Sequence, residues 1–138
     1  MTESVAECRQ RMVDHLETLD AAKADKIGSP SLGDVVRQGD IYLTCIESLP
    51  TDGKPSQERQ LAPGTSQGSR HTVQGDANIV TGVRFQGMNS VLVGPAFECK
   101  SDVTVAHPEH GDRVLPEGTT WQVTYQQAYA DEVRRVQD

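Results

Sequence analysis

Aromatic residues are scarce in this chain, and cysteines are few. Two Phe, three Tyr and one Trp make up 4% of the 138 residues. A chain of this length favours one domain, and its core must be small and built mostly of Val, Leu and Ile. The three cysteines, Cys8, Cys45 and Cys99, are odd in number and far apart in sequence, which argues against a secreted disulfide framework.

Long apolar runs and clusters of basic residues are also lacking. No run approaches the roughly 18 apolar residues of a membrane span, and the first ten residues, M-T-E-S-V-A-E-C-R-Q, have no apolar segment typical of a signal peptide. The net charge is -7, and no stripe of Lys and Arg suits a phosphate backbone or an anionic membrane. We therefore expect no nucleic-acid or membrane partner, and a protein of the cytoplasm or of a particle assembled there.

Residues 1–28 are expected to be an N-terminal helical region. One long helix is predicted over residues 4–27, and Gly28-Ser29-Pro30 ends it. A narrow apolar stripe recurs at three- and four-residue spacing. It packs either on the chain's own β-domain or on a second chain, because a stripe of this width suits a helix seam. The second reading makes the stripe a surface for a protein partner or a second copy, with Val5, Cys8, Met12, Leu16 and Leu19 as the binding residues.

Residues 29–138 are expected to form a β-domain of short antiparallel strands joined by Gly and Pro turns, either a small sandwich or a small barrel. The run at 41–46 is apolar on both faces and is predicted to be an inner strand, with 35–36 as a short edge strand before the Gly39-Asp40 turn. Residues 49–70 are polar and contain three prolines and three glycines. They predict a long loop or arm, which Leu61 would anchor.

The clearest strand pattern lies at the end of this domain. Trp121, Val123 and Tyr125 alternate with polar residues, a period of two that predicts one buried and one wet face. The preceding L-P-E-G at 115–118 is typical of a turn. Strands at 114–115 and 120–125 are therefore expected to pair as a hairpin.

Three histidines in the β-domain are candidate metal ligands. His107-Pro108-Glu109-His110 follows a predicted strand, and the bend at the proline would let the two imidazoles converge with His71. Such donors suit zinc. The known H-x-x-E-H and H-E-x-x-H patterns need helical spacing, which Pro108 opposes. The other interpretation is that these histidines are loop residues that cap strand ends.

A second polar cluster lies at residues 65–71, T-S-Q-G-S-R-H. Arg70 could bind a carboxylate or phosphate in bidentate fashion. Alternatively, the hydroxyl groups of the cluster satisfy the backbone of a loop. No G-x-S-x-G elbow is present, and no other catalytic constellation can be recognised.

Several motifs together resemble a small uncharacterised protein family found in bacterial genomes and bacteriophages. They are listed here in chain order: Q-G-D-I-Y at 38–42, G-T-S-Q-G-S-R-H at 64–71, V-G-P at 93–95, T-V-A-H-P-E-H at 104–110, L-P-E-G-T at 115–119 and V-T-Y-Q-Q-A-Y at 123–129. The resemblance covers residues 36–138. Some members have a histidine where Ser69 stands here, so a histidine-rich metal site in the family would be weakened in this chain. The family implies no settled activity.

The sequence thus predicts a non-enzymatic binding or assembly module, oligomeric, of the kind found in a virion or another particle. It would need no cofactor. The alternative is a metal-dependent enzyme or a metal-binding protein that uses His71, His107 and His110 to hold zinc.

Overall fold

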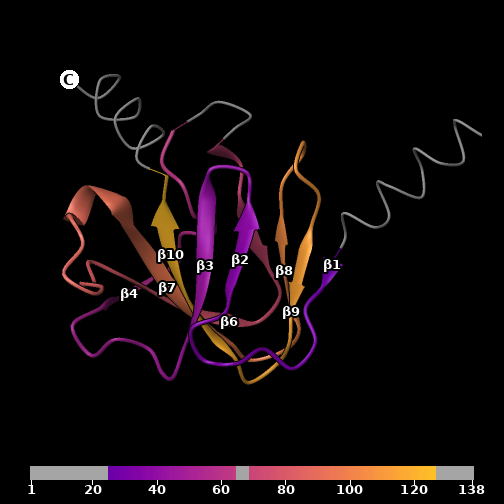
Figure 1. The fold of residues 1–138 in the computed structure, drawn as a ribbon, viewed down its shortest axis with the longest axis horizontal. Coiled ribbons are helices and arrows are strands. Elements are labelled where there is room, and N and C mark those ends of the chain that lie inside the picture. The colour runs from indigo at the N-terminus through magenta and orange to yellow at the C-terminus, as the bar shows by residue number, and fades with distance from the viewer. Residues whose placement is uncertain (1–24, 65–68, 127–138) are drawn as a thin grey trace, which may run out of the picture.

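The computed structural model describes residues 25–64 and 69–126, whose strands form two sheets (Figure 1). In sheet order, the smaller sheet comprises Asp25–Lys26 (β1), Arg113–Leu115 (β9), Val103–Ala106 (β8) and Thr72–Gln74 (β5). The larger sheet comprises Val35–Gln38 (β2), Ile41–Ile46 (β3), Thr120–Tyr125 (β10), Val93–Cys99 (β7), Ala77–Thr81 (β6) and Lys54–Ser56 (β4). A short 3-10 helix, Ser90–Leu92 (η2), precedes β7.

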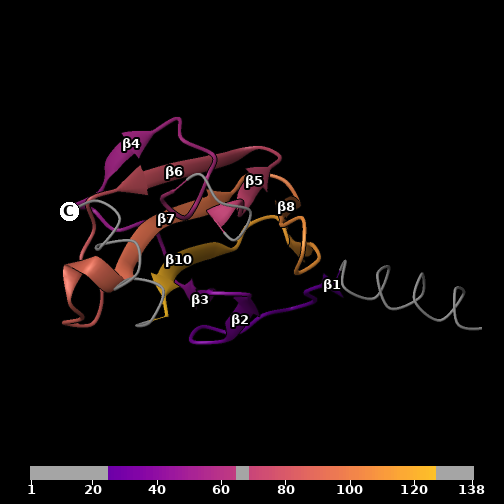
Figure 2. The ribbon, with the colours of Figure 1, turned by 90° about the horizontal axis from the view of Figure 1, so that it is seen from above.

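All pairs are antiparallel except β1 with β9. The fold is therefore mostly β, as predicted, and of the two expected architectures it is not the closed barrel. Figure 2 shows the larger sheet in its strand order, with β5 and β8 beside one end of it. No helix among the described residues is long and apolar enough to cross a bilayer.

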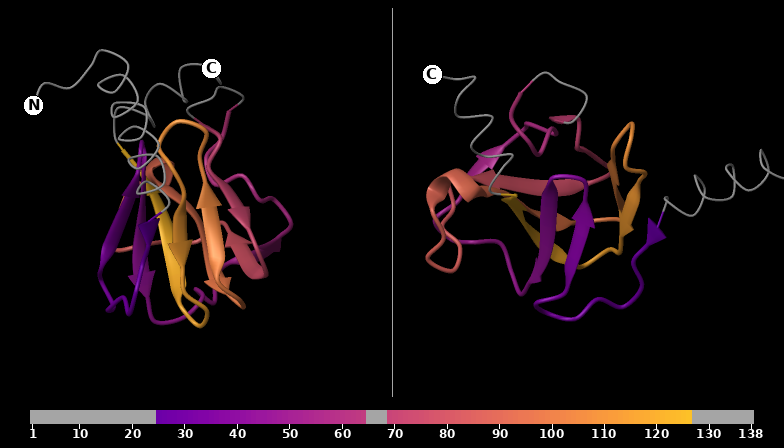
Figure 3. Two further views of the ribbon diagram at one scale, coloured as in Figure 1. Left: turned by 90° about the vertical axis from the view of Figure 1, so that its right-hand side faces the viewer. Right: turned by 45° about the horizontal axis from the view of Figure 1, so that its top comes forward.

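One apolar core joins the two sheets, which are seen side by side in Figure 3. Alternate residues of β3 point into it, since Ile41, Leu43 and Cys45 are buried while their neighbours are half-buried. Trp121 and Phe97 are the largest side chains in the core, and both are 0% exposed. The predictions of β3 at 41–46 as an inner strand and of an edge strand before it are confirmed, because β3 lies between β2 and β10.

The expected hairpin between 114–115 and 120–125 is wrong. β9 pairs with β8 and β1 in the smaller sheet, whereas β10 pairs with β3 and β7 in the larger one. The turn itself exists, because the N–H of Thr119 donates to the carbonyl of Pro116 over 3.3 Å. It carries the chain from one sheet to the other instead of folding it back on the same sheet.

The expectation that β10 has one wet face is also wrong. Gln122 is 0% exposed, as are Trp121 and Val123. A second, smaller apolar cluster of Val80, Val83 and Ala96 lies apart from the main core. The Nε2 of Gln122 donates to the carbonyls of Gly94, Pro95 and Val123. The buried amide nitrogen is thus paired with the backbone, whereas Oε1 of Gln122 has no hydrogen-bond partner among the described residues.

The predicted N-terminal helix and its stripe of Val5, Cys8, Met12, Leu16 and Leu19 lie outside the described residues. Asp25 and Lys26, at the expected end of that helix, form strand β1 instead. In the polar segment 49–70, the described part contains the short strand β4, which the sequence did not predict. Leu61 does anchor this segment, since it is 1% exposed and belongs to the main core.

Candidate functional site

The buried side chain of Gln38 connects three segments of the chain. Gln38 ends β2 and is 0% exposed. Its Nε2 donates to the carbonyl of Val105 at 2.8 Å and to that of Gly111 at 2.6 Å. Because both acceptors are oxygens, the amide nitrogen must face them, and the amide oxygen must face the other way.

That oxygen contacts His71, which comes immediately before β5. Oε1 of Gln38 lies 2.8 Å from Nδ1 of His71, and His71 is also 0% exposed. A carboxamide oxygen can only accept, so the hydrogen of this bond belongs to Nδ1. In the neutral ring, the lone pair is then on Nε2. The end of β2 thus sets the tautomer of the histidine at the start of β5.

His107, which follows β8, has the opposite tautomer. Its Nδ1 accepts the backbone N–H groups of Glu109 at 3.0 Å and His110 at 3.1 Å. Pro108 bends the chain directly after the imidazole, which brings these two N–H groups back over the ring. The lone pair is therefore on Nδ1, and Nε2 of the neutral ring carries the hydrogen.

The three predicted histidines come together as a row of rings, called here the histidine cluster: His71, His107 and His110. The ring centroids of His71 and His107 are 4.3 Å apart, and those of His107 and His110 are 4.5 Å apart. The angle between the ring planes is 44° in the first pair and 34° in the second. His110 also lies against the backbone of Gly39. Gln38 and Gly39 are members of the site that the sequence did not indicate, although the Q-G-D motif contains both.

The hydrogen bonds oppose the use of this row as a three-ligand metal centre. A histidine binds a metal through a nitrogen lone pair. The lone pair of His107 is directed at its own backbone, which leaves Nε2 of His71 and the ring of His110 as donors. Among residues 25–64 and 69–126, no group of three or more His, Cys, Asp or Glu is placed to hold a metal ion.

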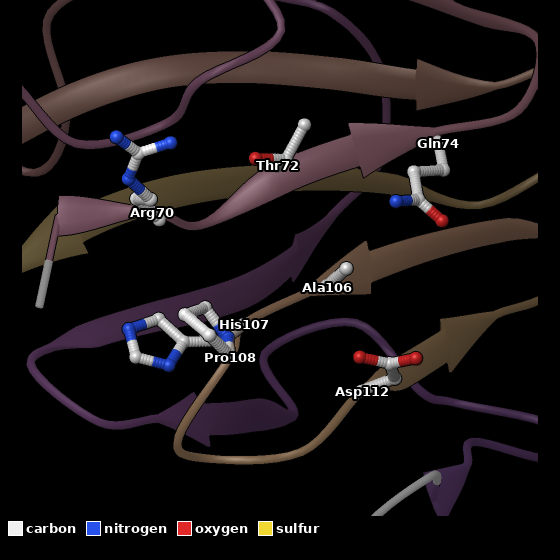
Figure 4. A pocket seen from close by; sticks show the side chains of 7 residues that line it. All are labelled: Arg70, Thr72, Gln74, Ala106, His107, Pro108 and Asp112. Carbon is white, nitrogen blue, oxygen red and sulfur yellow. The ribbon is translucent and has the colours of Figure 1, made fainter. Parts of the chain in front are cut away.

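A groove of about 600 Å³ opens beside the cluster, on the outer side of the smaller sheet. We call it the outer groove; it is lined by Arg70, Thr72, Gln74, Ala106, His107, Pro108 and Asp112. Figure 4 shows that its side chains come from β5 and the segment before it, from the end of β8, and from the loop between β8 and β9. Arg70, the predicted anion contact, is exposed here. His107 belongs to both the cluster and the groove.

Fold and site together describe a two-sheet β-domain with a buried glutamine–histidine pair beside a polar groove. The family model of the domain of unknown function DUF8820 matches residues 37–126, which is more than half of the chain, and the chain belongs to this family. The matched range contains Gln38, the whole histidine cluster and the outer groove. Comparison with curated proteins gives no match, and comparison with solved structures gives none.

Proposed function

We propose that this domain is a non-enzymatic binding module whose ligand site is the outer groove. The observation that carries the proposal is the buried Gln38–His71 pair beside this groove. Polar networks whose groups are paired inside a protein hold neighbouring segments in one geometry. Here they fix the ends of β2, β5 and β8, and a ligand would meet a preformed surface on rigid strands.

Burial of two of the three imidazoles supports binding rather than catalysis. His71 is 0% exposed and His107 only 5%, whereas His110 is exposed. A general acid or base must come within hydrogen-bond reach of its substrate. Nδ1 of each buried ring is already hydrogen-bonded to a neighbouring part of the chain. The two buried imidazoles therefore organise the site, and the exposed side chains of the groove meet the ligand.

One NMR experiment tests binding and catalysis together. The ¹⁵N-labelled protein is mixed with pools of small metabolites, and the spectra of both protein and compounds are followed for several hours. We expect amide shifts confined to residues 70–74 and 106–112, with unchanged compound spectra. Conversion of a compound would contradict the non-enzymatic proposal, and shifts only elsewhere would contradict the location of the site.

The module is also proposed to assemble with itself or with a protein partner, as part of a virion or another particle formed in the cytoplasm. Leu32 and Val35 support this, since they are 65% and 57% exposed at or next to edge strand β2. Exposed apolar side chains on a strand edge favour pairing. Light scattering after size exclusion should give an oligomer that Val35→Lys makes smaller, while Val91→Lys leaves it unchanged. A monomeric wild type would contradict assembly.

One observation favours metal binding as a second candidate. The hydrogen bond from Nδ1 of His71 to Oε1 of Gln38 is of the kind that orients a metal-binding histidine, and it leaves Nε2 with its lone pair. Zinc analysis of the purified protein, with melting before and after chelation, decides between the candidates. Metal-free protein with unchanged melting is expected for the binding module. Near-stoichiometric zinc that stabilises the protein would favour the metal site.

A further inference from the structure

The outer groove follows from the alternation of side chains along one short segment. His71 and Val73 point into the protein, with 0% and 2% of their surface exposed. Arg70, Thr72 and Gln74, which alternate with them, line the groove on the opposite side. The segment that supplies the buried histidine therefore also supplies three polar side chains to the surface.

Opposite charges lie on opposite sides of this groove. Arg70 comes before β5 and Asp112 before β9, and β8, which contributes Ala106, lies between these two strands (Figure 4). Within residues 25–64 and 69–126, neither Arg70 nor Asp112 takes part in an ion pair. Both charges are thus available to a ligand that spans the groove.

We infer that the outer groove binds a short zwitterionic peptide, with its carboxylate at Arg70 and its amino group at Asp112. The inference rests on the binding function proposed above and names its ligand class. Arg70 suits a carboxylate because its planar guanidinium can donate two parallel hydrogen bonds. β5 and β9 are two strand spacings apart, roughly 10 Å, and an extended tripeptide of about 10 Å is comparable in length.

The remaining lining of the groove suits a peptide backbone. Ala106 is small, and the hydroxyl of Thr72 and the amide of Gln74 can each donate and accept hydrogen bonds. The two charges also provide discrimination. A dicarboxylate would place one negative group beside Asp112, and a diamine would place one positive group beside Arg70, and both arrangements are repulsive.

Triglycine, N-acetyl-triglycine and triglycine amide are the probes that test this inference. Amide shifts of the full-length ¹⁵N-labelled protein are followed during titration with each. Triglycine should shift residues of the outer groove, and each capped form should bind about tenfold more weakly, as expected for the loss of one charged hydrogen bond. Arg70→Gln should remove the difference between triglycine and its amide, and Asp112→Asn the difference between triglycine and its acetyl form. The control variants Arg84→Gln and Glu117→Gln change exposed charges outside the groove and should change neither difference.

Equal binding of capped and uncapped peptides would overturn the inference, as would the absence of groove shifts at millimolar triglycine. The capped peptides test the wild type directly, so the result does not depend on how well a variant folds. The proposed binding function is tested separately from the peptide inference. If triglycine does not bind but another compound of the metabolite pools shifts the amide signals of the outer groove, only the peptide inference is wrong. If no compound shifts these signals, both are wrong.

Discussion

Gly39 and the imidazole of His110 are in direct contact, although they belong to opposite ends of the family region. A side-chain carbon at position 39 would lie 2.7 Å from Nε2 of His110, closer than such atoms approach in real proteins. Gly39 also has a φ of 55°, in the left-handed region that favours glycine. The turn between β2 and β3 therefore needs glycine for two reasons, its backbone conformation and the ring beside it.

Gly39→Ala should lower the free energy of unfolding by about 2 to 3 kcal/mol. The left-handed conformation accounts for about 1 kcal/mol, and displacement of His110 accounts for the rest. Gly87→Ala is the matched control, because Gly87 has a φ of 69° and open space around it. It should lose only the conformational part. Urea unfolding measures both, and equal losses would show that His110 moves away without cost.

Gln38→Leu should destabilise the protein by more than about 3 kcal/mol. The change leaves the carbonyls of Val105 and Gly111 and the Nδ1–H of His71 without the glutamine amide, and each buried group left unsatisfied costs about 1 to 3 kcal/mol. Gln74→Leu, an exposed change, should stay within about 0.5 kcal/mol. Long-range ¹⁵N–¹H spectra should also show that His71 no longer holds a single Nδ1–H tautomer. A variant that keeps this tautomer would argue against Gln38 as its cause.

Trp121→Ala should cost about 3 to 5 kcal/mol, the range of large aromatic truncations in cores. Trp121 is 0% exposed, lies opposite Cys45 and Phe97 on the neighbouring strands, and donates from Nε1 to the hydroxyl of Thr119 at 2.9 Å. Chemical denaturation is the measurement. Leu32→Ala, at an exposed site, serves as the control, and similar small changes at both positions would contradict the burial of Trp121.

The thiol of Cys99 should make stability fall at high pH. Burial raises its pKa to about 11 from the ordinary value of 9.0. Because the folded state favours the neutral thiol, this contribution is complete below pH 9 and is lost as the pH rises through 11. The stability advantage of the wild type over Cys99→Ala should therefore shrink by about 1 to 2 kcal/mol between pH 8 and 11. A constant difference across this range in urea unfolding would contradict the shift.

Strands β3 and β8 could be predicted from sequence because both are uninterrupted runs rich in apolar and β-branched residues between turn signals. The partner of β10 could not. The Pro116–Gly118 turn indicates that the chain changes direction, but no local feature says whether the next strand returns to the same sheet or enters another. The burial of Gln122 is equally non-local, since it depends on carbonyl groups of β7.

The single proline bend at residue 108 predicts that His71, His107 and His110 converge, and the structure does bring the rings together. What the sequence could not supply is the direction of their nitrogen atoms. For His107 that direction depends on the backbone N–H groups of Glu109 and His110. For His71 it depends on Gln38, a residue whose polarity alone suggests an exposed strand end. The partners of Gln38 lie 33, 67 and 73 residues further along the chain, beyond the reach of any local pattern.

The long separation between Gln38 and its partners has a consequence for the order of folding. During synthesis the end of β2 emerges early, whereas the carbonyls of Val105 and Gly111 are made 67 and 73 residues after Gln38. Contacts this distant in sequence form late and slowly. A nascent or truncated chain that ends before Gly111 cannot complete the site. A ligand that binds the proposed site in the outer groove would therefore report that the chain has been synthesised and folded through residue 112, which covers most of the family region.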